Sequence, residues 1–392
     1  MTNGSSDFSK LSFAYNFKGD QRFDTKFNAY GVNPSKGIDD YFLSFAQGVR
    51  FVNIDLAVGE GVSNVYQYLG DNIGFGAQQA FLGYQSYIIN PSFEVSNNTD
   101  YISASNPQKN SLNHNFFVTE TGANKKHSFT ISTQYRDNLY LGMNINSYNS
   151  EFKRTDYLRE NNYGVGSDFI ETEFENELST LADGFSIQLG AIYKPSPNIR
   201  LGLSYQSPTW YRIQEELVQY VATYREDGSD EVDPQIINLY EYNVKTPSKL
   251  STGLAYIFGS KGLISFEYNL VNFQNIEFDT QQGNDDSINL NKEIKSTLKK
   301  AATYRIGGEY RIEELSLRGG YFSHQNLNKT TPDFSKGYSL GIGYDFGGSN
   351  LSATFLKQKS ERTELIYQQG LEDPIDLNKE QVQIVVTYSL KL

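Results

Sequence analysis

The stretch GYSLGIGYDFGGSNLSATFLKQ, Gly337 to Gln358, indicates the fold of this chain. It reads as two strands joined at Gly347-Gly348. In the first strand, large apolar side chains alternate with small or polar ones. The large set is Tyr338, Leu340, Ile342, Tyr344 and Phe346, and the small set is Gly337, Ser339, Gly341, Gly343 and Asp345. Because side chains of a strand alternate between its two faces, one face is apolar and the other is small and polar. The fold depends on which face points inward.

The composition narrows the class of protein. The chain has 392 residues, of which only 38% are hydrophobic, and its mean hydropathy is -0.53. It contains no apolar run of about 18 residues, the length that a transmembrane helix needs. It has no cysteine, which excludes disulfides and cysteine-based metal sites. The net charge of -12 argues against binding to nucleic acid, because nucleic-acid-binding proteins present a basic surface.

Period-2 segments recur along the whole chain and predict about fourteen strands. Most are ten or more residues long, which exceeds the usual length of about 5–6 residues in soluble proteins. The expected strands are 8–18, 41–48, 50–60, 126–136, 138–151, 183–194, 198–208, 246–258, 261–275, 299–311, 314–324, 336–346, 349–362 and 379–392.

The connections between these segments alternate between short and long. Tight turns are expected around Val49 and at Asp137-Asn138, Pro195–Asn198, Gly259-Ser260, Ile312-Glu313 and Gly347-Gly348. The other connections run over 19–40, 61–125, 152–182, 209–245, 276–298, 325–335 and 363–378. This layout is typical of bacterial outer-membrane barrels, which have short periplasmic turns and long extracellular loops. We therefore expect an all-β fold, a transmembrane antiparallel β-barrel of about 14 strands, closed so that no sheet edge remains in lipid.

In such a barrel the apolar face meets lipid and the polar face lines the lumen. The aromatic face of Gly337–Gln358 is then expected to point outward. Charged residues on the opposite faces of several strands predict a lumenal polar network of Arg200, Glu267, Arg305, Glu309 and Arg318. These residues pair as a structural network or meet a ligand carboxylate, for which arginine is well suited.

The C-terminal stretch QVQIVVTYSLKL agrees with this interpretation. Its apolar row, Val382, Ile384, Val386, Tyr388, Leu390 and Leu392, resembles the terminal strand of outer-membrane proteins, which usually ends in an aromatic residue. The alternative is a buried last strand of a soluble sandwich.

Three hairpins resemble those of the FadL/OmpP1/TodX family of outer-membrane transporters. They are ADGFSIQLGAIYKPSPNIRLGLSYQSPTWYRIQEE (182–216), TPSKLSTGLAYIFGSKGLISFEYNLVNF (246–273) and AATYRIGGEYRIEELSLRGGYFSHQNL (301–327). The richness in Tyr, Phe and Asn looks like members from Bacteroidota. The resemblance implies a fourteen-stranded barrel that imports long-chain fatty acids or aromatic hydrocarbons. It also implies capture by an extracellular loop, passage through a lumenal pocket, and lateral exit at a kink in the third strand.

The family also has an N-terminal hatch that plugs the lumen. Here the first expected strand begins near Phe8, and MTNGSSDF lacks the apolar segment of a secretory signal. We expect that the hatch belongs to a longer form of the protein.

The segment VYQYLGDNIGFGAQQAFLGYQSYIINP, 65–91, is the main non-strand candidate within a single barrel domain spanning 1–392. Apolar residues recur in it at helical spacing and Pro91 ends the run, so we expect a helix near 65–89 in the extracellular loop region 61–125. The residues expected to capture a ligand are Leu69, Ile73, Phe81, Tyr84 and Tyr87. The alternative is a helix that only caps the barrel mouth.

Two further features bear on an exit route. Gly59 and Gly61 end the expected third strand and are candidates for the lateral exit kink, the alternative being ordinary glycines at a strand end. Pro208 has no N–H for a ladder and must end its strand or lie in a bulge. The only tryptophan, Trp210, follows it and is expected to lie at the membrane interface.

The function expected from these features is outer-membrane transport of hydrophobic molecules, with a hydrophobic small molecule or lipid and the outer-membrane lipid as partners. No enzymatic activity, cofactor or metal site is expected, because His114, His127 and His324 accompany no nucleophile motif. Two alternatives remain open: a shuttle or scaffold barrel of type IX secretion that binds a protein partner, and a nonspecific porin.

Overall fold

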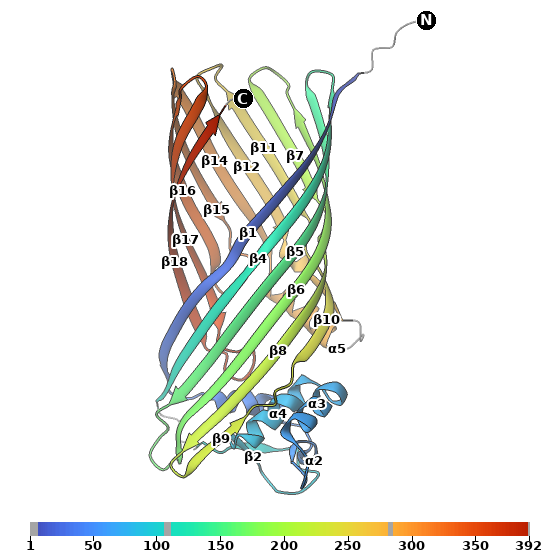
Figure 1. The fold of residues 1–392 in the computed structure, drawn as a ribbon, viewed down its shortest axis with the longest axis vertical. Coiled ribbons are helices and arrows are strands. Elements are labelled where there is room, and N and C mark those ends of the chain that lie inside the picture. Colours follow the sequence, from blue (N-terminus) through green and yellow to red (C-terminus); the bar gives the residue numbers. More distant parts are fainter. Residues whose placement is uncertain (1–6, 106–110, 281–284, 391–392) are drawn as a thin grey trace, which may run out of the picture.

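A computed structural model describes residues 7–105, 111–280 and 285–390. Its dominant feature is one antiparallel sheet, curled into a tall barrel (Figure 1). Within the described residues, the main path through the sheet contains twelve strands in chain order. The strands on it are β1 (Phe8–Asn33), β4 (Leu112–Tyr135), β5 (Leu139–Asn161), β6 (Phe169–Tyr193), β7 (Ile199–Gln206), β11 (Lys249–Ile257), β12 (Gly262–Asn272), β14 (Lys300–Ile312), β15 (Leu315–His324), β16 (Asp333–Asp345), β17 (Ser349–Leu365) and β18 (Pro374–Leu390).

Three further strands extend the sheet beyond breaks in this path. β8 (Trp210–Arg225) pairs with β6, β10 (Asn238–Lys245) pairs with β8, and β13 (Glu277–Thr280) pairs with β10. They therefore continue β7, β11 and β12 toward one end of the barrel. A short strand, β9 (Gly228–Val232), is added to β8.

One end of the barrel carries only tight turns, which we call the turn end. The turns join β4 to β5, β6 to β7, β11 to β12, β14 to β15 and β16 to β17, at the five predicted places. All longer connections lie at the other end, the loop end (Figure 1). The prediction that loops are sorted by length to the two ends is confirmed for these strands.

The outward face of Gly337–Gln358 is the aromatic one, as predicted. Tyr338, Leu340 and Ile342 are 44%, 59% and 51% exposed, and they pair with outward residues of the neighbouring strands. On the opposite face, Gly341 and Gly343 make room for the side chain of Arg318, whose atoms lie close to both glycines. The apolar face therefore meets lipid, and the fold is a transmembrane antiparallel β-barrel.

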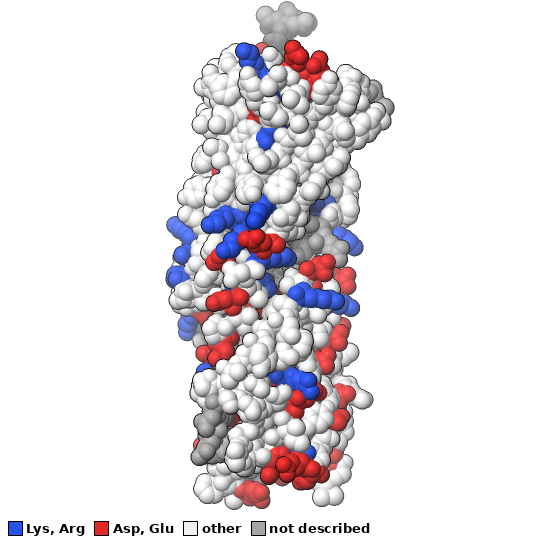
Figure 2. Space-filling view, turned by 90° about the vertical axis from the view of Figure 1, so that its left-hand side faces the viewer, with Lys and Arg blue, Asp and Glu red and all other residues white. Residues whose placement is uncertain are grey.

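The longest strands have two halves of opposite character. In β5 the outward residues near the turn end are Leu141, Met143 and Ile145, whereas farther along the outward row becomes Ser147 to Lys153. Figure 2 shows the same change on another side of the barrel, where a charge-poor upper part lies above a part rich in charged residues. Only the half near the turn end is therefore fitted to lipid, and the other half stands beyond the membrane.

This division corrects the predicted strand lengths. Segments expected as loops, such as 152–182, lie largely in β5 and β6. A bulge in β1 between Asp20 and Phe23 lies opposite Gly122, where φ is +151° and a Cβ would lie 2.2 Å from the Glu151 carbonyl oxygen. Such bulges bend a strand locally.

A helical cap lies at the loop end, between β1 and β4 (Figure 1). It comprises α1 (Ile38–Ala46), α2 (Phe51–Ile54), α3 (Val62–Asn72), α4 (Phe75–Gln85) and the hairpin β2 (Ile89–Pro91) and β3 (Tyr101–Ser103). The expected strands 41–48 and 50–60, with the turn at Val49, are therefore wrong. Ile38, Phe42 and Ala46 are buried at helical spacing, and Asp39 and Asp40 lie in the first turn of α1, where the helix dipole favours negative charge.

The predicted helix near 65–89 is present as α3 and α4, which are separated at Gly74. The loop region that contains it was expected to end at residue 125. It ends at Ser111, because β4 begins at Leu112. A 3-10 turn, η1 (Phe273–Asn275), and α5 (Asp285–Thr297) occupy the connection between β12 and β14. Among the described helices, none combines the length and apolar character needed to cross a bilayer.

The expectation that the sheet has no edges differs from the structure. The described residues contain no strand pairing between β1 and β18, so these two strands are the edges of the sheet. β1 carries two register shifts, between Ser9 and Ser12 and between Asp20 and Phe23, and bulges disrupt the ladder of an edge strand. The outward row Val382 to Leu390 of β18 is exposed as predicted, and Leu392 lies outside the described residues.

Candidate functional site

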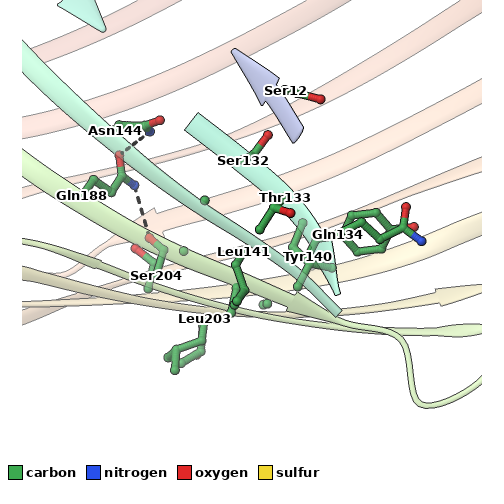
Figure 3. A pocket seen from close by; sticks show the side chains of 18 of the residues that line it. Ser12, Ser132, Thr133, Gln134, Tyr140, Leu141, Asn144, Gln188, Leu203 and Ser204 are labelled. Carbon is green, nitrogen blue, oxygen red and sulfur yellow. Dashed lines mark hydrogen bonds between the residues drawn. The ribbon is translucent and has the colours of Figure 1, made fainter. Parts of the chain in front are cut away.

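The lumen near the turn end contains a cavity of about 640 Å³. Residues from β1, β4, β5, β6, β7, β11 and β12 line it, and they include small and polar side chains together with Tyr140, Leu141 and Leu203 (Figure 3). Asn144 Nδ2 donates to Gln188 Oε1 at 3.3 Å, and Gln188 Nε2 donates to Ser204 Oγ at 3.2 Å. Glycines at 142, 190, 202 and 253 have no side chains to fill the cavity. The membrane half of the lumen therefore combines hydrogen-bonding side chains with apolar surface.

A second lumenal cavity of about 480 Å³ adjoins the first, since Gly202, Gly253 and Glu267 line both. Of the predicted polar network, Arg200, Glu267 and Arg305 line this cavity, and the ion pairs of the network form two separate groups. Arg305 Nη1 pairs with Glu267 Oε1 at 2.5 Å, and Arg318 Nε pairs with Glu309 Oε2 at 2.7 Å.

Glu309 also contacts Arg311, which the prediction did not include. Arg200, in contrast, donates to the carbonyl oxygens of Ser196 and Ile199 in the turn. Four of the five predicted residues therefore form ion pairs, and Arg200 instead stabilises the turn between β6 and β7.

Three adjacent strands are interrupted at one height of the barrel wall, at the loop side of the membrane half. The interruptions are 207–209 between β7 and β8, 246–248 between β10 and β11, and η1 between β12 and β13. We call them the wall break. Thr246 N donates to the Thr209 carbonyl at 2.9 Å, and Thr209 N donates to Thr246 Oγ1 at 3.0 Å, so the first two interruptions are direct neighbours. Pro208 and Pro247 lack the N–H groups that would continue the ladders.

Aromatic side chains flank the wall break on both sides. Trp210 faces outward, is 48% exposed and pairs with the outward Phe185. Tyr211, the next residue, faces the lumen and lies against Gly184, where a Cβ would come within 2.4 Å of the Tyr211 ring. The Tyr211 ring centroid is 6.0 Å from that of Tyr148. Gly184 therefore permits Tyr211 to lie flat against the inner side of the wall.

An open groove of about 670 Å³ lies outside the wall break. It is lined by Phe185 and Trp210 together with the outward residues of β10 and β13. Lys245 Nζ pairs with Glu277 Oε2 at 2.8 Å along this groove. Trp210 thus lies at the boundary between the apolar and polar halves of the outer surface, as an interfacial tryptophan does.

The predicted capture residues divide between the inside and the outside of the cap. Leu69 and Phe81 are 0% exposed and belong to the core of the cap. Tyr84 packs edge-on against Phe51 at 5.2 Å between ring centroids. Ile73 and Tyr87 are 47% and 48% exposed, and Tyr87 stacks under Arg225 at 4.8 Å. Leu69 and Phe81 therefore offer no surface to a ligand in this arrangement.

The predicted exit kink at Gly59 and Gly61 is wrong. Gly59 lies between α2 and α3 with φ of +92°, and Gly61 precedes the first residue of α3. Neither residue lies in a strand. The prediction failed because the segment 50–60 is part of the cap.

Buried polar contacts fix the cap in the barrel mouth. Gln219 Oε1 of β8 accepts from Tyr66 Oη and from Gln79 Nε2, each at 2.8 Å. Gln219 Nε2 donates to Asn176 Oδ1 of β6 at 2.7 Å. Burial raises the pKa of the Tyr66 hydroxyl well above its ordinary value, so it remains a donor.

A second set of contacts holds the start of α1. Glu160 of β5 is 1% exposed and accepts from Ile38 N at 2.9 Å, while its other oxygen accepts from Tyr163 Oη at 2.9 Å. His114 Nε2 lies 2.7 Å from Glu160 Oε2. The other two histidines contact Tyr15 and Thr303, so the three lie in separate environments.

Sequence reasoning identified the interruption at Pro208 and missed Thr246–Ser248, Gly184 and Tyr211. Pro247 carried the same signal as Pro208, but only the register shows that the two lie side by side. Among the described residues, no cluster of His, Asp and Glu is arranged to hold a metal ion.

No protein-family model matches the chain, and no curated protein matches it. Several solved structures do. They include a FadL homologue from Pseudomonas aeruginosa (12% identity, TM-score 0.48, covering 71% of this chain and 73% of that one). They also include the toluene transporter TodX of Pseudomonas putida (14% identity, TM-score 0.43, 72% and 79%) and the toluene transporter TbuX of Ralstonia pickettii (13% identity, TM-score 0.42, 71% and 77%).

Proposed function

We propose that the protein carries small hydrophobic molecules through an outer membrane, with the loop end facing outward, and releases them sideways through the wall break. The observation that carries this proposal is the wall break itself. It interrupts three neighbouring strands between the lumen and an outer groove that Phe185 and Trp210 line together with charged residues. An interrupted ladder leaves backbone N–H and C=O groups without ladder partners, and such groups cost free energy near lipid. We therefore infer that the break is retained because it serves a function.

The chemistry of the lumen supports a sideways route. The cavity beyond the break, toward the turn end, is lined by polar side chains such as Ser132, Gln134 and Asn144 and also by apolar ones such as Leu141. A hydrophobic molecule there would leave some of these polar groups without water or another partner, which makes the bilayer the more favourable destination. Phe185 and Trp210 offer aromatic surface at the outer side of the break, in a groove that charged side chains of β6, β8, β10 and β13 also line.

The cap provides the entry side of the proposed route. Of the residues proposed for capture, Ile73 and Tyr87 are exposed and are the ones that meet a ligand first. Leu69, Phe81 and Tyr84 would act by holding α3 and α4 in place. No enzymatic step and no cofactor are part of this proposal.

The proposal is tested by uptake of a labelled fatty acid and of toluene in cells that express the protein in place of their own transporter. The Trp210→Ala and Phe185→Ala variants should lower uptake, whereas Trp210→Phe should retain it. Equal uptake by all variants and the wild type would contradict an exit at the wall break.

A nonspecific porin is the second candidate, and the hydrogen-bonding side chains that line the lumenal cavity favour it. In planar bilayers a porin would conduct ions steadily, and its conductance would respond to residues such as Asn144 that line the cavity. A transporter closed by its cap should conduct little.

A further inference from the structure

A groove of about 530 Å³ lies on the barrel at the loop side of the lipid-facing band, over β14, β15 and β16. Three lysines line it: Lys299, Lys300 and Lys336. Tyr321 and Phe334 supply its aromatic surface. It borders the third interruption of the wall break, since Phe273 N of η1 donates to the Lys299 carbonyl oxygen at 3.3 Å, but the proposed route past Phe185 and Trp210 does not use its lysines.

The register places this groove at the edge of the membrane. Tyr321 of β15 pairs with Tyr338 of β16, and both are outward members of the apolar rows. One step farther toward the loop end on the same face, Ser323 pairs with Lys336. Lys300 lies at the start of β14 and is exposed. The lysines therefore lie where the headgroups of the lipid leaflet on the loop side begin.

The charges of this groove are not balanced by the protein. Among the described residues, no Asp or Glu lies within ion-pairing distance of Lys299, Lys300 or Lys336, and no carboxylate lines the groove. The lysines of the neighbouring strand β17 differ, since Lys359 pairs with Glu361 at 2.6 Å and Lys357 with Glu380 at 3.2 Å. Lys336 Nζ lies 5.9 Å from the centroid of the Phe334 ring, an interaction that leaves its charge available.

The excess of positive charge is local, because the chain as a whole carries a net charge of -12. Figure 2, which views the barrel from the side of β16 to β18, shows Lys and Arg side chains, with Asp and Glu side chains among them, just below the charge-poor part. Lysine binds phosphate as a point charge, and basic pockets beside the membrane bind phosphorylated headgroups.

We propose that this groove is a binding site for a phosphorylated lipid of the leaflet on the loop side, with the phosphate among the three lysines and the acyl chains along the row of Tyr321 and Tyr338. This inference goes beyond the transport function and does not depend on it. It requires only that the barrel spans a membrane.

The test is native mass spectrometry of the full-length protein in mild detergent with added diphosphorylated lipid A. The variant is Lys299→Gln/Lys300→Gln/Lys336→Gln. The control is Lys26→Gln/Lys125→Gln/Lys153→Gln, which removes the same number of charges from exposed positions of β1, β4 and β5. Heat-dependent gel migration confirms that both variants keep the folded barrel.

We expect the wild type and the control to retain one lipid A, and the groove variant to need at least about tenfold more lipid for the same occupancy, since each phosphate contact is charge-assisted. Lipid A without phosphates should not occupy the site, and inorganic phosphate alone should not displace the lipid.

Three results would overturn the proposal: equal binding by the groove variant, equal binding of the dephosphorylated lipid, or displacement by inorganic phosphate at low concentration. The last would show a site for a free anion.

Discussion

Thr209 and Thr246 bond to each other across two strand interruptions, each through a backbone N–H. Thr209 follows Pro208 and Thr246 precedes Pro247, so the two strands lose their ladders at the same point, and these two hydrogen bonds join the interruptions. These bonds connect the strands at the point where the barrel wall has few ladder hydrogen bonds. An exit route through the wall would have to open next to them.

The close approach of Gly184 and Tyr211 gives a first prediction. A Cβ at position 184 would lie 2.4 Å from the Tyr211 ring, so Gly184→Ala should displace Tyr211 from the wall. If Tyr211 closes the inner side of the break, Gly184→Ala and Tyr211→Ala should each change uptake of a hydrophobic dye by about threefold or more in the same direction, and the double variant should match Tyr211→Ala.

Gly190→Ala is the matched control, because a Cβ there meets nothing closer than Ser204 Cβ at 3.8 Å. Additive effects of Gly184→Ala and Tyr211→Ala would show that the two residues do not act through one contact.

Gln219 gives a second prediction, about the cap. Gln219→Leu should leave Tyr66, Gln79 and Asn176 without their buried partner, at a cost of about 1–3 kcal/mol per unsatisfied group. The cap should then open more often, and limited proteolysis should cut it faster, while the barrel stays folded on a gel.

Gln214→Leu is the control for this experiment, since Gln214 lies on the same strand and bonds to Glu241 on the exposed surface. If Gln214→Leu sensitises the cap as much as Gln219→Leu does, the buried network does not hold the cap in place.

The membrane half of the barrel was predictable from the sequence for a physical reason. Its signals are local: Tyr338 to Phe346 alternate strictly because one face meets lipid, and Gly347 turns with φ of +86°. The loop-side half was not predictable in this way. There the outer face is polar, and the inner face is apolar only where the cap packs, as at Leu158 and Phe174.

The candidate site shows a similar limit. Pro208 predicts an interruption because it lacks the N–H that a ladder needs. Only the strand register shows that the interruption at Thr246–Ser248 lies next to it. The cap helix α1 was missed because its short apolar run, Tyr41 to Phe45, fits either a strand or a helix without its contacts to β6.

Alkaline titration of the cap gives a third prediction. Burial, followed by the charge of Asp55, raises the pKa of Tyr84 to about 12, and burial raises the pKa of Tyr101 to about 12. Both folded-state values exceed that of an unfolded tyrosine, which is about 10. Their stabilisation is therefore complete below pH 10 and is lost as the pH rises from about 10 to 12.

The helical circular dichroism of the cap should fall in that pH window. Tyr84→Phe/Tyr101→Phe should move the loss to higher pH, and Tyr68→Phe, an exposed tyrosine of α3, should leave it in place. This assignment would be contradicted if the helical signal were lost completely below pH 9. It would also be contradicted if the double variant lost the signal at the same pH as the wild type.

The exit route is tested most directly by locking the wall break. The chain has no cysteine, so Thr209→Cys/Thr246→Cys introduces a single pair, at cross-strand neighbours that lie within the usual reach of a disulfide. Uptake of labelled fatty acid is measured in cells with and without a membrane-impermeant reductant. We predict strong loss of uptake when the disulfide is formed and recovery on reduction, while each single cysteine variant behaves as wild type. Full uptake through the locked barrel would contradict an exit at the break and would direct attention to the unpaired edges of β1 and β18.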